Sequence, residues 1–146
     1  MFRGSYSARV DDKGRVKIPA AFLGSLQEKY SGEFFVTSLT GQFVRIYPLE
    51  VWHEIEERLA QVSSTNRSKK KFLNLVNYYG QVVALDKQGR VLIPSVLRES
   101  AAMRGDVTVL GQLTYLDVWN QQRFLEDVRK NPITPEDEKI LDDLGV

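Results

Sequence analysis

The decapeptide VDDKGRVKIP at residues 10–19 is repeated as LDKQGRVLIP at residues 85–94. Asp, Gly, Arg, Val, Ile and Pro are identical at six of the ten positions and keep the same order, which indicates an internal duplication. In both copies Asp-x-x-Gly is typical of a turn, because the carboxylate accepts backbone hydrogen bonds and glycine tolerates positive φ. The alternation in Arg-Val-x-Ile predicts a strand, which the proline ends before a helix can begin.

The duplication continues downstream of the decapeptide. Residues 43–47 match 115–119 at an offset of 72, whereas the decapeptides are offset by 75, so the second copy is three residues shorter. Each copy is predicted to contain an extended segment, the turn and strand of the decapeptide, a short helix and a hairpin. These segments are 6–10, 20–23, 33–39 and 43–47 in the first copy and 81–85, 95–98, 106–110 and 113–119 in the second, with hairpin turns at 40–41 and 111–112.

The small size of each copy decides how the two combine. A unit of about 45 residues buries too little surface for a core of its own. Two copies in one chain can close on each other and cover each other's sheet edges. We therefore expect an α+β, mainly β fold, in which the two repeats form one pseudo-twofold β-barrel with flanking helices. The expected segments are a first repeat at 5–47, a helical connection at 48–75, a second repeat at 76–119 and a C-terminal helical segment at 120–146.

The stretch between the copies is predicted to form two helices separated by the polar segment 63–66. The second of these carries the densest basic run of the chain at 67–71, which is expected to stay in solvent. Its apolar face is expected to pack inward and consists of Phe72, Leu75, Val76 and Tyr79. The boundary signals are Asn66 or Ser68 as a cap, Gly80 as a stop, and Thr134-Pro135 as the start of a C-terminal helix.

The composition gives little support to enzymatic chemistry. The chain has no cysteine, and its single histidine, His53, stands among glutamates on a predicted helix, where a solvated position is favoured. We therefore predict no catalytic residue, no cofactor and no metal site, although a hydrolase or transferase stays as a third alternative. The sequence has no apolar run long enough to cross a bilayer and no signal peptide at its start, so we expect a cytoplasmic protein without a membrane partner.

Charge is distributed unevenly along the chain, although the net charge is only +1. Residues 1–19 hold an excess of basic side chains, and residues 126–146 hold an excess of acidic ones. This polarity is compatible with one face that meets a polyanion. The aromatic residues at matched repeat positions could stack on bases, but packing in the core is the favoured interpretation. They are Phe43, Trp52, Tyr115 and Trp119.

The paired motif, placed after Met1-Phe2-Arg3-Gly4, resembles the MraZ family, which belongs to the AbrB-like (SpoVT-AbrB) superfamily of swapped-hairpin DNA-binding proteins. The resemblance extends from Met1 to about Phe124, and the segment after Asn131 lies outside it. It implies a fused version of the two-chain AbrB barrel that assembles into rings. It also implies a nucleoid-associated regulator that binds short direct repeats in double-stranded DNA, upstream of the division and cell-wall gene cluster that includes its own gene.

The resemblance also assigns roles to residues of the two motifs. It implies that Arg15 and Arg90 contact DNA, that Asp11 and Asp86 orient them, and that Gly14 and Gly89 shape the turns. A phosphate-binding face could be extended by Arg3, Arg9, Lys13, Lys17 and Lys87. The alternative is that each arginine only pairs with its aspartate to lock the turn, and that the lysines are ordinary surface charge. The family often has arginine four residues after the proline, as at Arg98, whereas the first copy has Leu23.

A second function stays open beside DNA binding. AbrB-like barrels also occur in protein-binding modules comparable to antitoxins, which usually carry a separate partner-binding tail. The acidic end at 136–146 is the candidate for such a tail in this chain. The sequence therefore leaves a DNA-binding regulator and a protein-binding module as the two main alternatives.

Overall fold

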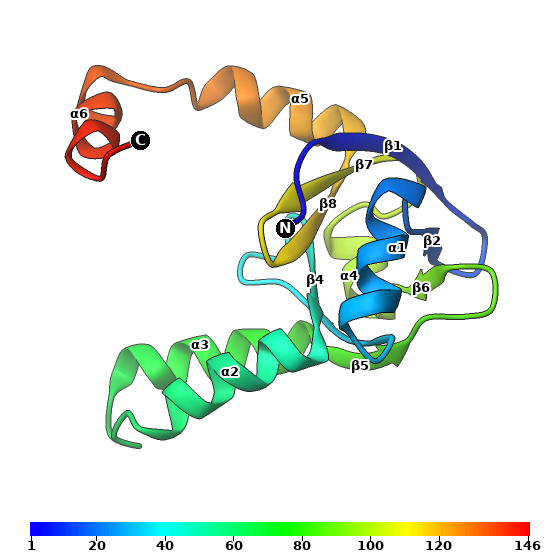
Figure 1. Cartoon of the computed structure of the whole chain (residues 1–146), viewed down its shortest axis with the longest axis horizontal. Coiled ribbons are helices and arrows are strands. Elements are labelled where there is room, and N and C mark those ends of the chain that lie inside the picture. Colours follow the sequence, from blue (N-terminus) through cyan, green and yellow to red (C-terminus); the bar gives the residue numbers. More distant parts are fainter.

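The computed structural model describes all 146 residues, Met1–Val146. Eight strands and six helices follow one another along the chain (Figure 1). They are β1 (Ser5–Val10), β2 (Arg15–Lys17), α1 (Ala20–Lys29), β3 (Glu33–Thr37), β4 (Val44–Pro48), α2 (Leu49–Ala60), α3 (Arg67–Tyr79), β5 (Gln81–Ala84), β6 (Arg90–Leu92), α4 (Ser95–Ser100), β7 (Gly105–Gln112), β8 (Tyr115–Asn120), α5 (Gln121–Lys130) and α6 (Pro135–Asp143).

The strands form one antiparallel sheet in the order β5-β3-β4-β8-β7-β1-β2-β6. Its two outermost strands, β5 and β6, are consecutive in the chain and joined by the second motif turn, where the Asp86 N–H donates to the Arg90 carbonyl at 3.0 Å. The sheet therefore curls into a nearly closed barrel. The mainly β, two-repeat barrel predicted from the duplication is confirmed.

The two repeats exchange strands instead of standing side by side. β1 of the first repeat pairs along its whole length with β7 of the second, and β5 of the second repeat pairs with β3 of the first. β2 pairs with β6 about Val16↔Val91, and β4 pairs with β8 about Arg45↔Asp117. Both central pairs join equivalent residues of the two copies, so the pseudo-twofold axis passes through them.

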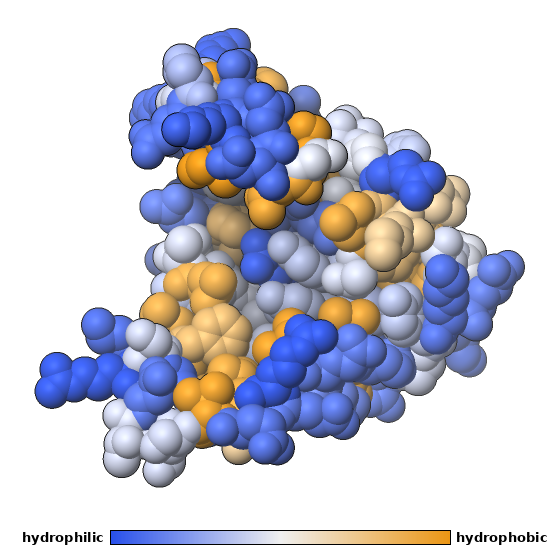
Figure 2. Space-filling view, turned by 60° about the vertical axis from the view of Figure 1, so that its left-hand side comes forward, coloured by the Kyte–Doolittle hydropathy of each residue, from blue (hydrophilic) through white to orange (hydrophobic).

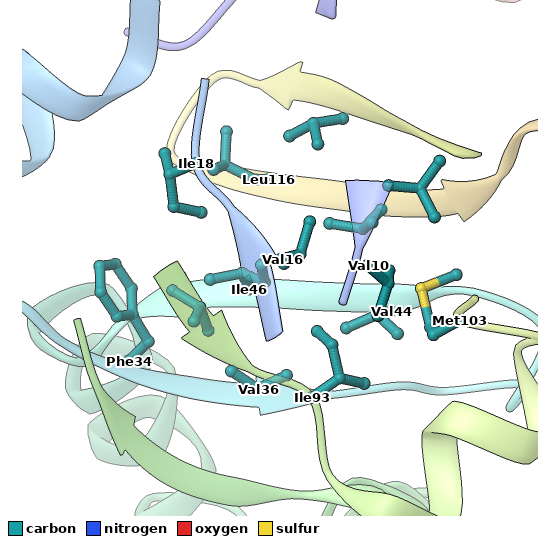
Figure 3. Close-up of a cluster of buried hydrophobic side chains, with 14 of the residues drawn as sticks. Val10, Val16, Ile18, Phe34, Val36, Val44, Ile46, Ile93, Met103 and Leu116 are labelled. Carbon is teal, nitrogen blue, oxygen red and sulfur yellow. The ribbon is translucent and has the colours of Figure 1, made fainter. Parts of the chain in front are cut away.

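The barrel interior is filled by side chains that both repeats supply (Figure 3). Val16 and Val91, which are equivalent in the two repeats, are fully buried, as are the equivalent residues Ile46 and Val118. A buried aliphatic side chain of this size contributes roughly 1.5–3 kcal/mol of transfer free energy. Neither copy lines the interior alone, which agrees with the prediction that each is too small for a core of its own.

Two segments account for the three residues that the second copy lacks. The equivalent pairs Phe34↔Pro48 and Val107↔Asn120 show that β3 and β7 are offset by 73 residues. Two residues are therefore lost between the motif strand and this hairpin, where α4 is shorter than α1. The third is lost in the hairpin loop itself.

The hairpin turn predicted at residues 111–112 is wrong. β7 continues through Gln112, and the turn lies at Leu113-Thr114, where Leu113 takes a positive φ of 66°. The Gly111 N–H donates to the Gly4 carbonyl at 2.8 Å, and a Cβ on Gly111 would lie 2.4 Å from the Arg3 backbone nitrogen. The glycine is thus required by the close approach of the N-terminal chain and not by a turn.

The helices α2 and α3 form a hairpin that packs on the barrel beside β3 and β4 and then projects from it (Figure 1). Asn66 caps α3 by accepting from the Lys69 N–H at 3.0 Å, which decides between the two predicted caps. Leu75 is 41% exposed, so its predicted inward packing is wrong, whereas Val76 is buried against Trp52. The short helices predicted at 20–23 and 95–98 continue to Lys29 and Ser100.

The C-terminal helices leave the barrel on another side (Figure 1). α5 follows β8 directly, and α6 lies at the end of this arm, with no buried residue in either helix. Thr134 and Asp137 form a capping box at the start of α6, as Thr134-Pro135 predicted. No helix of the chain has the length and apolar character needed to span a membrane.

Candidate nucleic-acid interface

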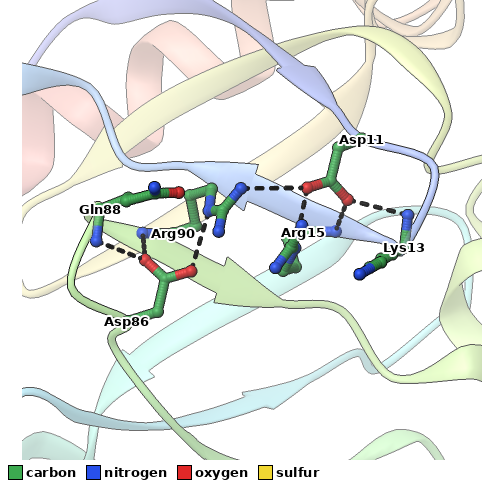
Figure 4. Close-up of polar contacts among 6 residues, drawn as sticks. All are labelled: Asp11, Lys13, Arg15, Asp86, Gln88 and Arg90. Carbon is green, nitrogen blue, oxygen red and sulfur yellow. Dashed lines mark hydrogen bonds and ion pairs between the residues drawn. The ribbon is translucent and has the colours of Figure 1, made fainter.

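The two motif turns have the same hydrogen bonds (Figure 4). In the first, Asp11 Oδ1 accepts from the backbone N–H groups of Lys13 and Arg15, both at 2.9 Å, and Oδ2 accepts from Arg15 Nε at 2.8 Å. In the second, Asp86 accepts in the same way from Gln88 and Arg90, at 2.8–2.9 Å. Each aspartate therefore fixes both the turn backbone and the guanidinium that follows it.

These bonds lower the pKa of both aspartates. For Asp11 the main cause is the hydrogen bond from the Arg15 backbone N–H, which with the Arg15 side chain outweighs desolvation. For Asp86 the Arg90 backbone N–H has the same role. A carboxylate that accepts several N–H bonds is stabilised in its charged form. Both carboxylates are therefore ionised at neutral pH and available to hold their arginines.

The two turns are also joined to each other across the pseudo-axis. The Ile18 N–H donates to the Gly89 carbonyl, and the Ile93 N–H donates to the Gly14 carbonyl, both at 2.9 Å. Gly14 and Gly89 have φ values of 81° and 75°, the left-handed conformation that the motif glycines predict. One arginine reaches the other turn, with an Arg90 terminal nitrogen 3.5 Å from Asp11 Oδ2. The turns of both copies thus form a single structural unit.

The outer face of β2 and β6 gathers most of the basic residues singled out in the sequence. Because Val16 and Val91 point into the barrel, the alternate residues of both strands point outward. The register pairs Arg15 with Leu92 and Lys17 with Arg90. Lys13 and Lys87 are exposed at the two turn tips. We call this surface the turn face; its charged residues are Asp11, Asp12, Lys13, Arg15, Lys17, Asp86, Lys87 and Arg90.

Arg3 is not part of the turn face. It lies beyond the other end of β1, where Phe2 bridges to Leu113 at the tip of the β7–β8 hairpin. Six residues lie between Arg3 and Val10, most of them in the extended strand β1, and they span roughly 20 Å. The structure therefore separates Arg3 from the five basic residues of the turn face, with which it was predicted to share a surface.

Each motif turn is covered by a side chain from the other repeat. The two covering residues occupy equivalent positions in the duplication. The Arg98 side chain covers Gly14, where a Cβ would lie 2.0 Å from Arg98 Nε, and this Nε donates to the Ile93 carbonyl at 2.9 Å. Leu23, which is equivalent to Arg98, covers Gly89 with its methyl groups. Because the first copy has Leu23 where the second has Arg98, one turn is covered by a guanidinium and the other by methyl groups.

The aromatic residues have two different locations. Trp52 is buried with Phe35, Tyr47 and Val76 between the helical hairpin and the barrel, as the core interpretation predicted. The others are half-buried on the outer face of β4 and β8, where Phe43 stacks on Trp119 at 4.5 Å and Tyr47 meets Tyr115 at 5.1 Å. His53 is exposed on α2 and contacts Glu56 at 2.9 Å, as predicted for a helix-face histidine.

A barrel whose halves exchange hairpins, with aspartate-clamped arginines on the strands at its pseudo-axis, defines the AbrB-like swapped-hairpin class. The family model described as "MraZ protein, putative antitoxin-like" matches residues 1–75 and 80–143. The chain belongs to this MraZ family. The match continues past Asn131 to residue 143, so the expectation that the resemblance stops before the C-terminal helix is wrong.

Several curated proteins named "Transcriptional regulator MraZ" are similar to this chain. The one from Acidobacterium capsulatum is 50% identical over 146 residues, covering 100% of both chains. The one from Koribacter versatilis is 48% identical over 147 residues, again covering 100% of both. The one from Shewanella oneidensis is 31% identical over 129 residues, covering 88% of this chain and 85% of the relative.

Proposed function

We propose that the protein is a sequence-specific transcriptional regulator that binds double-stranded DNA with its turn face. The observation that carries this proposal is the pair of aspartate-clamped arginines on one exposed surface, Arg15 on β2 and Arg90 on β6. The names of the relatives support a regulatory role. A face with five basic and three acidic side chains suits a polyanion better than a neutral partner.

The geometry of the first clamp suits base or phosphate recognition. Asp11 binds Arg15 through Nε, and neither terminal nitrogen of Arg15 has a hydrogen-bond partner in the chain. A guanidinium held in this way presents two parallel donors, which match guanine O6 and N7 or two phosphate oxygens. Locking of the turn and contact with DNA are therefore compatible roles, because the aspartate presets the orientation of the donors.

The lysines of the turn face have a different role in this proposal. Lys13, Lys17 and Lys87 are exposed around the arginines, where their mobile ammonium groups can neutralise phosphates. Arg3 lies outside the turn face, so it has no part in the contact proposed for the two clamped arginines.

We further propose that several copies form a closed ring that binds consecutive direct repeats upstream of the division and cell-wall gene cluster, including the protein's own gene. A single turn face offers few phosphate contacts. Linked barrels on adjacent repeats raise the effective concentration of each contact. DNA binding of this kind would place the protein on the nucleoid.

The proposal is tested by fluorescence anisotropy with two duplexes of equal length, one from the region upstream of its own gene and one of shuffled sequence. We expect tighter binding to the first, and a loss of that preference in Arg15→Ala but not in Arg129→Ala, which removes an exposed arginine of α5. Equal, weak binding to both duplexes by the unmodified protein would contradict the proposal. That result would favour the protein-binding module, the second function that the sequence leaves open; the family description contains the words "antitoxin-like".

A further inference from the structure

Two helical projections leave the barrel with exposed apolar side chains. One is the α2–α3 hairpin, and the other is the arm of α5 and α6 (Figure 1). Figure 2 shows apolar surface on both projections, on either side of a hollow in the molecule. Neither projection is needed for the clamps at the turn face, so the proposed DNA contact leaves both surfaces unexplained.

On the hairpin, one face of α3 combines basic and apolar side chains. Phe72 and Val76 pack inward near Trp52, which turns the opposite side of the helix to solvent. Leu75 is 41% exposed and Tyr78 is 66% exposed on that side. Helical spacing aligns them with two exposed cations. We call this row the α3 stripe; it consists of Arg67, Lys71, Leu75 and Tyr78.

The arm carries the opposite charge beside similar apolar side chains. Ile140 on α6 is 52% exposed, Leu144, the C-cap residue one turn further on, is 71% exposed, and Val146 is 83% exposed. Glu136 and Asp143 flank this apolar row at helical spacing. The residues 135–146 contain five acidic side chains and one basic one, whereas α3 contains four basic side chains and no acidic one.

The build of α6 indicates that it has a partner. A nine-residue helix is marginal in water without packing, and α6 has no buried residue in the single chain. Its N-terminus is nevertheless fixed by a complete capping box, which defines where the helix begins. A defined helix with an open apolar row is typical of an element that packs on another surface.

We propose that α6 of one copy packs on the α3 stripe of a second copy of this chain. The apolar rows would meet, and Glu136 and Asp143 of the arm would face Arg67 and Lys71 of the stripe. The two surfaces are different, so the contact is head-to-tail and generates a ring or an open chain of copies. This inference rests on the self-association included in the proposed function and names the surfaces that make it.

Cross-linking tests the contact directly, because the chain has no cysteine of its own. Leu75→Cys and Leu144→Cys proteins are prepared separately, mixed and oxidised at micromolar concentration. We expect a disulfide-linked dimer that contains one copy of each protein. Leu75→Cys mixed with Val96→Cys, whose exposed side chain lies on α4 outside both surfaces, should give far less product. Equal products in both mixtures would overturn the proposal.

Charge reversal supplies a second measurement. The mass by light scattering should fall toward that of one chain in Lys71→Glu and in Asp143→Lys, and should recover when the two substitutions are combined. The control Lys70→Glu makes the same change on α3 outside the stripe and should keep the mass of the unmodified protein.

An unchanged mass in every reversal variant would overturn the contact, as would cross-linking only within one chain of a Leu75→Cys/Leu144→Cys protein. A monomeric unmodified protein would overturn it too. The anisotropy assay separates this failure from that of DNA binding, because a monomer that still prefers its upstream duplex keeps the turn face as the DNA-binding surface.

Discussion

Arg45 and Asp117 occupy equivalent positions in the two repeats and face each other across β4 and β8, with Arg45 Nε 2.9 Å from Asp117 Oδ1. A barrel built from two identical chains would bring the same residue to both sides of this axis. The duplicated chain instead places opposite charges there, with the Arg45 guanidinium 4.4 Å from the centre of the Tyr115 ring. The pair thus favours association of unlike repeats over association of like ones.

Removal of Asp117 should destabilise the fold strongly. The Asp117 side chain is 6% exposed and that of Arg45 is 19% exposed, so Asp117→Ala leaves a largely buried guanidinium without its partner. Breaking such a pair costs about 3–5 kcal/mol. Urea unfolding should show this loss, and Arg45→Met/Asp117→Leu should recover most of it. A loss below about 1 kcal/mol in Asp117→Ala would contradict a buried, essential pair.

The clamp on Arg15 should depend on pH in a defined direction. Because the pKa of Asp11 is lowered in the folded chain, its ionised form contributes stability above the unfolded pKa of about 3.9, and this is lost as pH falls through the folded value. The melting temperature of Asp11→Asn should therefore lie below that of the unmodified protein at pH 7. The difference should be constant down to about pH 5 and should shrink below about pH 4. A melting-temperature difference between the two proteins that grows on acidification would contradict the predicted direction of the pH dependence.

Loss of either clamped arginine should reduce DNA binding without unfolding the protein. If Arg15 contacts a base edge, Arg15→Ala should cost about 1–3 kcal/mol and relax sequence preference. If it contacts phosphate, binding to every duplex should weaken and the salt dependence should fall. Salt titrations with the upstream and shuffled duplexes distinguish these results, with Arg90→Ala as the equivalent variant of the second copy. An unchanged affinity together with a lowered melting temperature would assign Arg15 to the turn alone.

Leu92 makes the turn face asymmetric and should influence specificity. It is 37% exposed and stands where the first copy has Lys17. Leu92→Lys should raise the affinity for the upstream duplex and for the shuffled duplex, and it should narrow the difference between these two affinities. The salt dependence of binding should steepen by about one released ion. Leu113→Lys, at the far end of the barrel, should leave the slope unchanged. If the two variants behave alike, net charge and not the position of Leu92 governs binding.

Much of the fold could be predicted because the duplicated motif is local. The turn, the strand and the glycine conformations depend on residues within ten positions, so the sequence was sufficient for them. Contacts between the copies were not predictable in this way. Arg98 over Gly14 joins residues 84 positions apart, and Gly111 is a glycine because the N-terminal chain crosses it.

The candidate site was also only partly predictable. Five of the basic residues expected to share a surface do so, because four follow from the motif turns and Lys17 from strand alternation. Arg3 has no such local constraint, and its distance depends on the path of β1. The roles of these residues in DNA binding and the proposed division into repeats at 5–47 and 76–119 remain predictions. Residue 76 itself lies inside α3.

The exchange of strands has a consequence for synthesis of the protein on the ribosome. β1, at the N-terminus, finds its full partner only in β7, with Ser5 opposite Leu110. The first repeat therefore has no complete sheet to join until three quarters of the chain has been translated. High contact order of this kind slows folding and prolongs exposure of unpaired strands. The nascent barrel should consequently fold after translation, as one cooperative event, and should depend on chaperones more than a tandem of independent repeats would.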